Sequence, residues 1–299
     1  MRVIPLASES LGVRSLATFV EAAGIKILID PGVALGPKRY GLPPAKAEIE
    51  ALHSMRRKIQ GYAKRADVIT ISHYHYDHHT PFFEGLYESS SEEYAREIYE
   101  GKLLFIKHPR ENINFSQRKR AWVFLKNAEP IARSIEFADG KNFDLGGVTL
   151  EFSPAVPHGS EGSKLGFVVM VLIDDGFRLI HASDIQLLNR KAVEWIVEKS
   201  PDLLITGGPP TYLGPRAAGS WETGIKNLNE IIRETNAEII LDHHIIRDKR
   251  YPEFFDGLEK RPKTFAGYLR VEDRPLEAYR RELHKLERGE KAEVPFKLG

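Results

Sequence analysis

The sequence predicts a single domain of mixed α/β class, in which layers of β-sheet are covered by helices. Short β-rich runs alternate with amphipathic helical segments over most of the 299 residues. The chain contains no internal repeat, low-complexity segment or Gly/Ser linker at which it would divide. With 42% hydrophobic and 28% charged residues it has enough apolar material for one core, so we expect one domain over 1–299.

The first part of the chain consists of expected strands followed by a long helix. β-rich runs at 14–22 and 25–30 flank an Ala-Gly pair that suits a hairpin turn. A segment rich in Gly and Pro, 31–37, interrupts this pattern, and apolar residues at helical spacing then predict a helix over 44–65. The β-branched run 66–72 lacks polar alternation, which is typical of a strand buried on both faces.

Residues 80–130 are mostly polar and have helical character, so we expect a helical insertion there. Beyond residue 188, helices alternate with strands. We expect strands at 103–106, 134–137, 148–153, 165–173, 177–182, 202–206 and 237–241, and helices at 188–199 and 221–234. Leu276, Tyr279 and Leu283 recur at helical spacing, which predicts a helical tail over about 275–299 that packs on the domain.

Charge, cysteine content and hydropathy restrict the classes of function. A net charge of +1 argues against binding nucleic acid through bulk electrostatics. Cysteine is absent, so any metal ion must be held by His, Asp and Glu. No run of 18 apolar residues occurs, and the opening MRVIPLASES lacks the apolar segment of a signal peptide. We therefore expect a cytoplasmic protein without a membrane partner.

The stretch ITISHYHYDHHTP (69–81) places four histidines and an aspartate within seven positions. His73 and His75 are two residues apart in an extended segment, so both can bind one ion. Asp77 and His78 follow where the chain turns, and they can face a second ion nearby. Nitrogen and oxygen ligands without sulfur suit Zn²⁺, with Mn²⁺ or Fe²⁺ as alternatives.

Later strands deliver further ligand-type side chains at their carboxyl ends. These side chains are His158 after 148–153, Asp184 after 177–182, and His243 and His244 after 237–241. Because the carboxyl ends of several strands can meet at one rim of a sheet, we expect these residues to complete the site. Asp184 also suits the cap of the helix that follows it, but we favour a metal-bridging carboxylate.

This order of motifs resembles the metallo-β-lactamase superfamily, and within it an archaeal branch with HYHYDHH and LDHH motifs. The resemblance covers roughly residues 11–245 and includes the first hairpin with the turn Asp30-Pro31-Gly32. It implies a four-layer αββα sandwich with a dinuclear metal site at one edge. It also implies the distribution of ligands: His73, His75 and His158 on the first ion, Asp77, His78 and His243 on the second, and Asp184 between them. In the superfamily the last ligand follows its strand after one intervening residue, which favours His243 over His244.

Other polar residues near these motifs are expected to orient the ligands and not to bind the ions. Asp30 resembles the structural aspartate of the superfamily, and His79, His181 and Asp242 lie beside expected ligands in the sequence.

Two further segments carry candidate substrate contacts. Tyr212 lies in GGPPTYL (207–213), and Arg247 lies in RDKRY just beyond the last metal motif. The basic and aromatic segment RKRAWVF (118–124) suits either a stacked substrate or the solvated face of an amphipathic helix. The near-neutral net charge favours the solvated face.

Two divalent ions close together generate hydroxide at neutral pH and stabilise the charge that develops on the substrate oxygen. We therefore expect a metal-dependent hydrolase in which Asp77 and Asp184 are the catalytic side chains. The resemblance implies esters, lactones, thioesters, β-lactams and phosphodiesters as candidate substrates. The alternative is a non-hydrolytic iron oxidoreductase of the same fold, mononuclear or dinuclear. His75 stands where oxygen-reducing diiron members carry Glu, which argues against that form.

Motif spacing disfavours the nuclease branches that the resemblance would allow. His158 and Asp184 are only 26 positions apart, which leaves no room for the arm of the tRNA-processing members. The 59 positions between Asp184 and His243 cannot hold the large domain of other nucleases. We expect a small-molecule or phosphoester substrate in preference to nucleic acid. His78 and His158 are 80 positions apart, and we expect the insertion between them to form a lid or wall over the ions.

Overall fold

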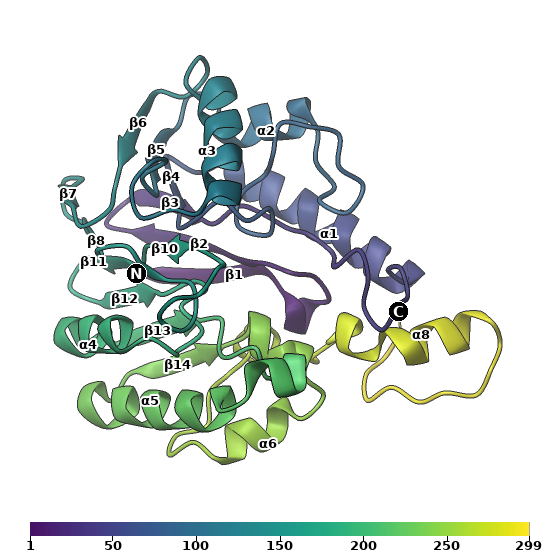
Figure 1. Cartoon of the computed structure of the whole chain (residues 1–299). Coiled ribbons are helices and arrows are strands. Elements are labelled where there is room, and N and C mark those ends of the chain that lie inside the picture. The colour runs from purple at the N-terminus through teal and green to yellow at the C-terminus, as the bar shows by residue number, and fades with distance from the viewer. Residues whose placement is uncertain (299) are drawn as a thin grey trace.

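Residues 1–298, which the computed structural model describes, form two six-stranded sheets between two layers of helices (Figure 1). The first sheet has the strand order β1-β2-β3-β4-β5-β6, and the second has the order β14-β13-β12-β11-β8-β7. The first sheet comprises β1 (Arg2–Ser8), β2 (Leu16–Ala22), β3 (Ile25–Ile29), β4 (Val68–Ile71), β5 (Leu103–Ile106) and β6 (Ser134–Phe137). The second comprises β7 (Asn142–Asp144), β8 (Thr149–Phe152), β11 (Val171–Asp174), β12 (Arg178–His181), β13 (Leu203–Thr206) and β14 (Glu238–Leu241).

Helices cover the outer face of each sheet, which confirms the expected αββα sandwich (Figure 1). The layer over the first sheet contains α1 (Lys46–Ala63), α2 (Glu92–Tyr99) and α3 (Phe115–Ala128). The layer over the second contains α4 (Arg190–Lys199), α5 (Ser220–Thr235) and α6 (Tyr251–Asp256). Short elements complete the chain: η1 (Glu9–Leu11), β9 (Val156–Pro157), β10 (Phe167–Val168), η2 (Thr211–Ala217), η3 (His243–Arg247), α7 (Phe265–Tyr268), η4 (Leu276–Tyr279) and α8 (Arg280–Glu287).

The side chains of β4 explain why this strand shows no polar alternation. Val68 packs into the apolar layer between the two sheets, while Ile69 and Ile71 pack against the helices. Both faces of the strand are therefore buried, as expected for a central strand of a covered sheet. β4 is parallel to β3 and β5, and β12, β13 and β14 are parallel to one another. Their carboxyl ends carry the metal-ligand motifs to one edge of the sandwich.

Residues 80–130 are an integral part of this architecture and not a separate lid. β5 lies between β4 and β6 in the first sheet, and α2 and α3 belong to the helix layer that covers it. The sequence-based expectation of a wall over the site is met only in part, because Glu88 and Arg120 line the cleft described below. A deletion of 88–128 would remove β5 and so would disrupt the first sheet.

α3 is amphipathic, and the segment RKRAWVF follows its two faces. Ala121 and Phe124 are buried against the first sheet, whereas Trp122 is 62% exposed. Arg118, Lys119 and Trp122 therefore form a solvated helix face, which agrees with the interpretation favoured by the net charge.

Three expectations about secondary structure need correction. The strand expected at 165–173 is divided into β10 and β11. Val169 lies between the two strands, and its backbone N–H donates to the Ser72 carbonyl, just beyond β4 of the first sheet. The short edge strand β7 was not expected. The C-terminal helical tail ends at Glu287, and residues 288–298 contain no helix.

The tail is attached to the domain by apolar and ionic contacts. Leu276, Leu283 and Phe296 form a small buried cluster with Ala45, at the start of α1. Arg280 and Glu48 form a fully buried ion pair, with Nη2 and Oε1 2.7 Å apart. Within residues 1–298, no helix has the length and apolar character that crossing a membrane requires.

Glu277 joins the tail to the loop before β2 and makes stability depend on pH. Its carboxylate accepts hydrogen bonds from Arg14 Nε and Nη2 at 2.6 and 2.7 Å. Burial raises the pKa of Glu277, but the Arg14 guanidinium outweighs burial and lowers the pKa to about 2. Because the folded pKa lies below the unfolded value, this pair stabilises the fold above about pH 4.5 and loses its effect as pH falls toward 2.

We expect Glu277→Gln to lower the free energy of unfolding at pH 7 by about 3 kcal/mol. This deficit relative to the wild type should shrink steadily between about pH 4.5 and 2. Guanidinium denaturation at several pH values measures it, with the exposed Glu293→Gln as control. A deficit that stays constant with pH would contradict the assignment.

Candidate metal centre

The histidine turn begins where β4 ends. All four residues of β4 are buried, and the chain leaves the sheet at Ser72. The backbone N–H groups of His78 and His79 both donate to the His75 carbonyl, so the second half of the turn is wound like a helix. This winding separates Asp77 and His78 from the extended His73 and His75, and so gives the motif its two groups of ligands.

Asp30 holds this turn in place from the end of β3. Its carboxylate accepts hydrogen bonds from Ser72 N at 2.8 Å, Ser72 Oγ at 2.6 Å and Ser183 Oγ at 3.0 Å. His78 Nδ1 lies 2.9 Å from the same carboxylate and donates to it, which leaves His78 Nε2 free for an ion. Asp30 adopts a φ of +47°, a backbone conformation that favours glycine and that this network holds.

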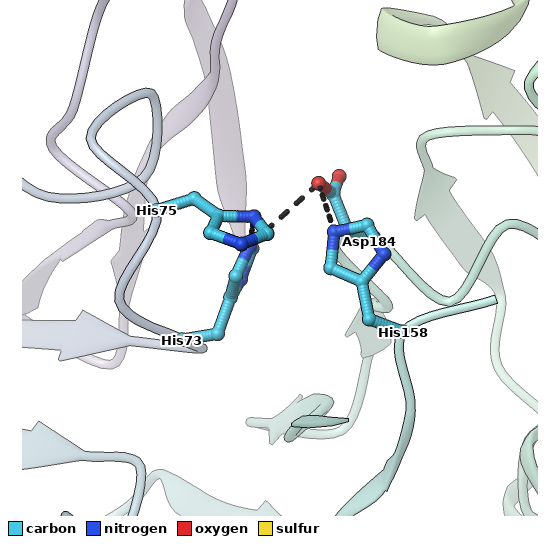
Figure 2. A group of neighbouring side chains, drawn as sticks. All are labelled: His73, His75, His158 and Asp184. Carbon is cyan, nitrogen blue, oxygen red and sulfur yellow. Dashed lines mark hydrogen bonds and ion pairs between the residues drawn. The ribbon is translucent and has the colours of Figure 1, made fainter. Parts of the chain in front are cut away.

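The first group of ligand-type side chains comprises His73, His75, His158 and Asp184. Figure 2 shows the imidazoles of His73 and His75 facing the Asp184 carboxylate from one side and His158 from the other. His73 Nε2 is 3.0 Å from His75 Nδ1 and 3.6 Å from Asp184 Oδ2. His158 Nε2 is 3.1 Å from the same oxygen.

The second group comprises Asp77, His78 and His243, and it also reaches Asp184. His243 Nε2 lies 3.4 Å from His78 Nε2 and 3.6 Å from Asp77 Oδ2. The Asp184 carboxylate is 3.2 Å from His78 Nε2 and 3.3 Å from His243 Nε2. Asp184 thus lies between the two groups, which is the position a bridging carboxylate requires.

The adjacent histidines of the last motif take different positions. His243 lies in the second group, whereas His244 Nε2 is 3.6 Å from Asp184 Oδ2 and its ring lines the open cleft. Asp184, His243 and His244 also form a third group whose ligand atoms lie close enough for one ion, so both histidines stay candidate ligands. His243 is the one of the two that also lies with Asp77 and His78.

The donor set fits divalent ions. Four ligand atoms at about 2.0–2.2 Å from a tetrahedral Zn²⁺ lie about 3.3–3.6 Å from one another. The observed separations of 3.0–3.6 Å are close to this range. The buried Asp184 Oδ1 and His158 Nε2 make no hydrogen bond with residues 1–298, although such atoms are normally satisfied. An ion would satisfy both.

The electrostatics of the site favour bound cations. Burial lowers the pKa of His73 well below its usual value and that of His75 to about 3, so both rings are neutral and can donate a lone pair to an ion. Burial also lowers the pKa of His243, but Glu9 and Asp184 outweigh burial and raise it to about 9. Carboxylates that favour a positive charge on a ligand histidine also favour a divalent ion in its place.

The residues expected to orient the ligands differ in what they contact. His79 Nδ1 donates to the His75 carbonyl at 2.9 Å, and Asp242 accepts from the His243 backbone N–H at 2.7 Å. His181 does not meet the expectation, because its Nε2 bonds to the Leu16 carbonyl at 2.9 Å and no hydrogen bond within residues 1–298 joins it to a ligand.

Sequence reasoning missed Glu9 and Gln186. Glu9 Oε2 accepts from His243 Nδ1 at 2.7 Å, and Oε1 accepts from Arg247 Nε at 2.5 Å. The Gln186 amide lies 3.3 Å from His158 Nδ1 and fixes the orientation of that ring. No motif marks Glu9, because only the folded chain brings η1 against η3.

The two groups of ligands open into a cleft of about 760 Å³. His75, Asp77, His158 and Asp184 form part of its lining, together with Tyr212 and Arg247 as the sequence predicts. Arg247 also donates to Tyr212 Oη at 3.3 Å, and its Nη2 lies 3.2 Å from His243 Nε2, in addition to its bond with Glu9. Arg247 therefore organises the protein side of the site, and its charge is already balanced by Glu9.

The chain matches a known protein family over most of its length. Residues 26–245 match the family model described as "Beta-lactamase superfamily domain". The chain is 89% identical over its whole length to the UPF0282 protein of Thermococcus gammatolerans, and the match covers all of that protein. It is 49% identical to the UPF0282 protein of Methanocaldococcus jannaschii, over 95% of this chain and 96% of that protein. The chain therefore belongs to the archaeal UPF0282 family of the beta-lactamase superfamily.

Solved structures are similar at the level of the fold. An isothiocyanate hydrolase from Delia radicum gut bacteria has a TM-score of 0.48 and 16% identity, with 97% of this chain and 93% of that chain covered. A diphosphatase of the PhnP family has a TM-score of 0.47 and 12% identity, with 88% and 93% covered.

Gly32 permits the close approach of the Asp30 loop to the histidine turn. A Cβ atom at position 32 would lie 2.3 Å from the His79 backbone nitrogen. We expect Gly32→Ala to displace the turn, destabilise the fold by about 1–3 kcal/mol and lower the metal content. Gly61→Ala is the matched control, because nothing lies within 4 Å of a Cβ there and α1 should gain stability. Thermal unfolding and elemental analysis compare the two, and full metal content in Gly32→Ala would contradict this role.

Glu9 should control the second ion selectively. Glu9→Gln keeps the shape of the side chain but removes the charge that balances the ion and orients His243. We expect affinity for the second ion to fall about 10–100-fold while the first ion is held as before. Competition with a chromophoric zinc chelator measures both affinities, with exposed Glu50→Gln as control. An equal loss at both sites, or none, would be inconsistent with this assignment.

Proposed function

We propose that the protein is a metal-dependent hydrolase acting on an ester, lactone or phosphodiester bond of a small molecule. One observation carries the proposal: two groups of buried ligand-type side chains share Asp184 at the wall of an open cleft. Membership of the superfamily supports the same class of reaction. His73, His75, His158 and Asp184 would hold one ion, and Asp77, His78, His243 and Asp184 the other.

When bound, two divalent ions would lower the pKa of a water molecule and polarise the carbonyl or phosphoryl oxygen of the substrate. Zn²⁺ is the ion that this sulfur-free set of imidazoles and carboxylates suits best, and Mn²⁺ and Fe²⁺ also fit such ligands. Ions of this kind act only where the substrate can reach them.

The side chains that line the cleft have different roles in the proposed reaction. The Asp77 side chain is 17% exposed and lines the cleft, so it can accept a proton from the attacking water. Asp184 is 1% exposed and keeps the two groups of ligands together. Tyr212 and His244 line the space in front of them, where they can contact the reacting group.

The test is reconstitution of metal-free protein with Zn²⁺, Mn²⁺ or Fe²⁺, followed by elemental analysis and a panel of 4-nitrophenyl esters, lactones and phosphodiesters. We expect two ions per chain and hydrolysis that a chelator abolishes. His75→Ala and Asp184→Asn should each lower kcat at least 100-fold, on the scale of about 10²–10³ for loss of one transition-state stabiliser. His284→Ala, in the C-terminal tail, should leave activity and metal content unchanged. One iron per chain with oxygen uptake and no hydrolysis would refute the proposal and favour the iron oxidoreductase alternative.

A further inference from the structure

Four arginines line the cleft, and their charges are not equally balanced. They are Arg14, Arg120, Arg216 and Arg247. Arg14 forms a bidentate pair with Glu277, as described above, and Arg247 is paired with Glu9. Within residues 1–298, neither Arg120 nor Arg216 has a carboxylate within 4 Å. Arg120 and Arg216 therefore line the cleft without a salt bridge among the described residues, and Glu88, which lines the same cleft, interacts with Arg120 only at longer range.

Arg120 is held in one orientation by its neighbours. It projects from α3, and its Nη1 donates to the Tyr74 carbonyl at 3.3 Å. Its guanidinium carbon lies 4.5 Å from the centre of the Tyr76 ring, so the planar group is stacked on an aromatic face. Both contacts come from the histidine turn, and they place the guanidinium next to His75. A guanidinium has five N–H donors, and this is the one hydrogen bond of Arg120 to residues 1–298.

The position of Arg120 sets it apart from the rest of the basic segment. Arg118 and Lys119 line a separate shallow groove on the solvent side of α3, with Trp122. Only Arg120 of the three basic residues in RKRAWVF lines the metal cleft. Arg120 is thus a half-buried arginine, held beside the ligand turn, whose remaining N–H donors are available to an anionic group in the cleft.

We propose that Arg120 binds a carboxylate or phosphate group of the substrate, with Arg216 supplying a second positive charge from the other half of the sandwich. This inference rests on the proposed hydrolase function and names its substrate class: a small anionic ester or lactone whose charged group lies outside the bond that is cleaved. A planar guanidinium binds either oxyanion in bidentate fashion.

The size and lining of the cleft agree with such a substrate. A volume of about 760 Å³ is that of a small-molecule site. Leu35, Leu165 and Leu213 contribute apolar surface to the same cleft. The substrate is accordingly an anion with an apolar body, which the leucines cover while Arg120 holds the charged end.

Two substrates that differ by a remote CH2COO⁻ group test the proposal. 4-Nitrophenyl acetate and the monoanion of 4-nitrophenyl succinate share the ester bond and the leaving group. We expect Arg120→Gln in the zinc-loaded protein to raise KM for the succinate about 10–100-fold, as for loss of a charge-assisted hydrogen bond. KM for the acetate should not change. Arg120→Lys keeps the charge but not the planar fork, and should give an intermediate KM.

Arg118→Gln is the matched control. It removes an identical charge two residues before Arg120 on the same helix, on the side that does not line the cleft. Its kinetics on both esters should equal those of the wild type. If Arg120→Gln raises KM for both esters alike, or for neither, the proposal is overturned. If Arg120→Gln fails to fold, Arg120→Lys takes its place. A higher KM for the succinate alone then supports the proposal, and an equal change in KM for both esters, or no change, overturns it.

A binding measurement separates this inference from the proposed hydrolysis. Calorimetric titration of the metal-free protein with phenylphosphonate and with succinate requires no turnover and distinguishes a phosphate from a carboxylate preference. We expect at least one of the two anions to bind the wild type about 10-fold or more tightly than Arg120→Gln. If no ester is hydrolysed but this difference is found, the hydrolase proposal fails and the anion site stands. Equal binding of both anions by the two proteins overturns the anion site.

Discussion

The buried carboxylate of Asp30 is the contact on which the site depends. It lies at the end of β3, yet it receives hydrogen bonds from Ser72 and His78 in the first half of the sandwich and from Ser183 in the second. A single fully buried side chain thus joins the two halves at the edge where the ligands meet. Without this acceptor the Ser72 backbone N–H, and the hydroxyls of both serines, would lose a buried partner, at a cost of about 1–3 kcal/mol for each unsatisfied group.

Backbone strain is concentrated at the same edge. Asp30, Ser183 and His243 have φ values of +47°, +49° and +61°, and each follows directly or within two residues the end of a strand. Such conformations persist where surrounding contacts hold them, and they cluster at functional sites. Here they turn the chain sharply out of the sheet, so that Asp184 and His243 point at the histidine turn and do not continue along their strands.

The second group of ligands depends on both ends of the chain. Glu9 of η1 supports His243 and Arg247, and Arg247 lies close to Arg14, whose charge is balanced by Glu277 in the tail. Arg14 and Arg247 therefore each have their own carboxylate, and this cluster carries little net charge of its own. η1 and the tail lie outside the matched superfamily domain at 26–245. Through Glu9 and Glu277 they nevertheless support the side chains of the site. Arg120 and Arg216, by contrast, line the cleft without a salt bridge among the described residues.

The sequence by itself determined the local part of this structure: β4 followed by the histidine turn, the strand-end positions of His158, Asp184 and His243, and the sandwich class. β4, the turn and the ligand positions follow from periodicity or from spacing within a few residues, because strand and helix geometry set the direction in which each side chain points. The sandwich class was implied by the resemblance to the metallo-β-lactamase superfamily. Only the tertiary structure brought His243 beside Asp77 and His78, placed Glu9 against His243 across 234 positions of sequence, and turned Arg120 into the cleft while its neighbour Trp122 faces solvent. Those outcomes depend on which distant elements pack together, and no local pattern contains that information.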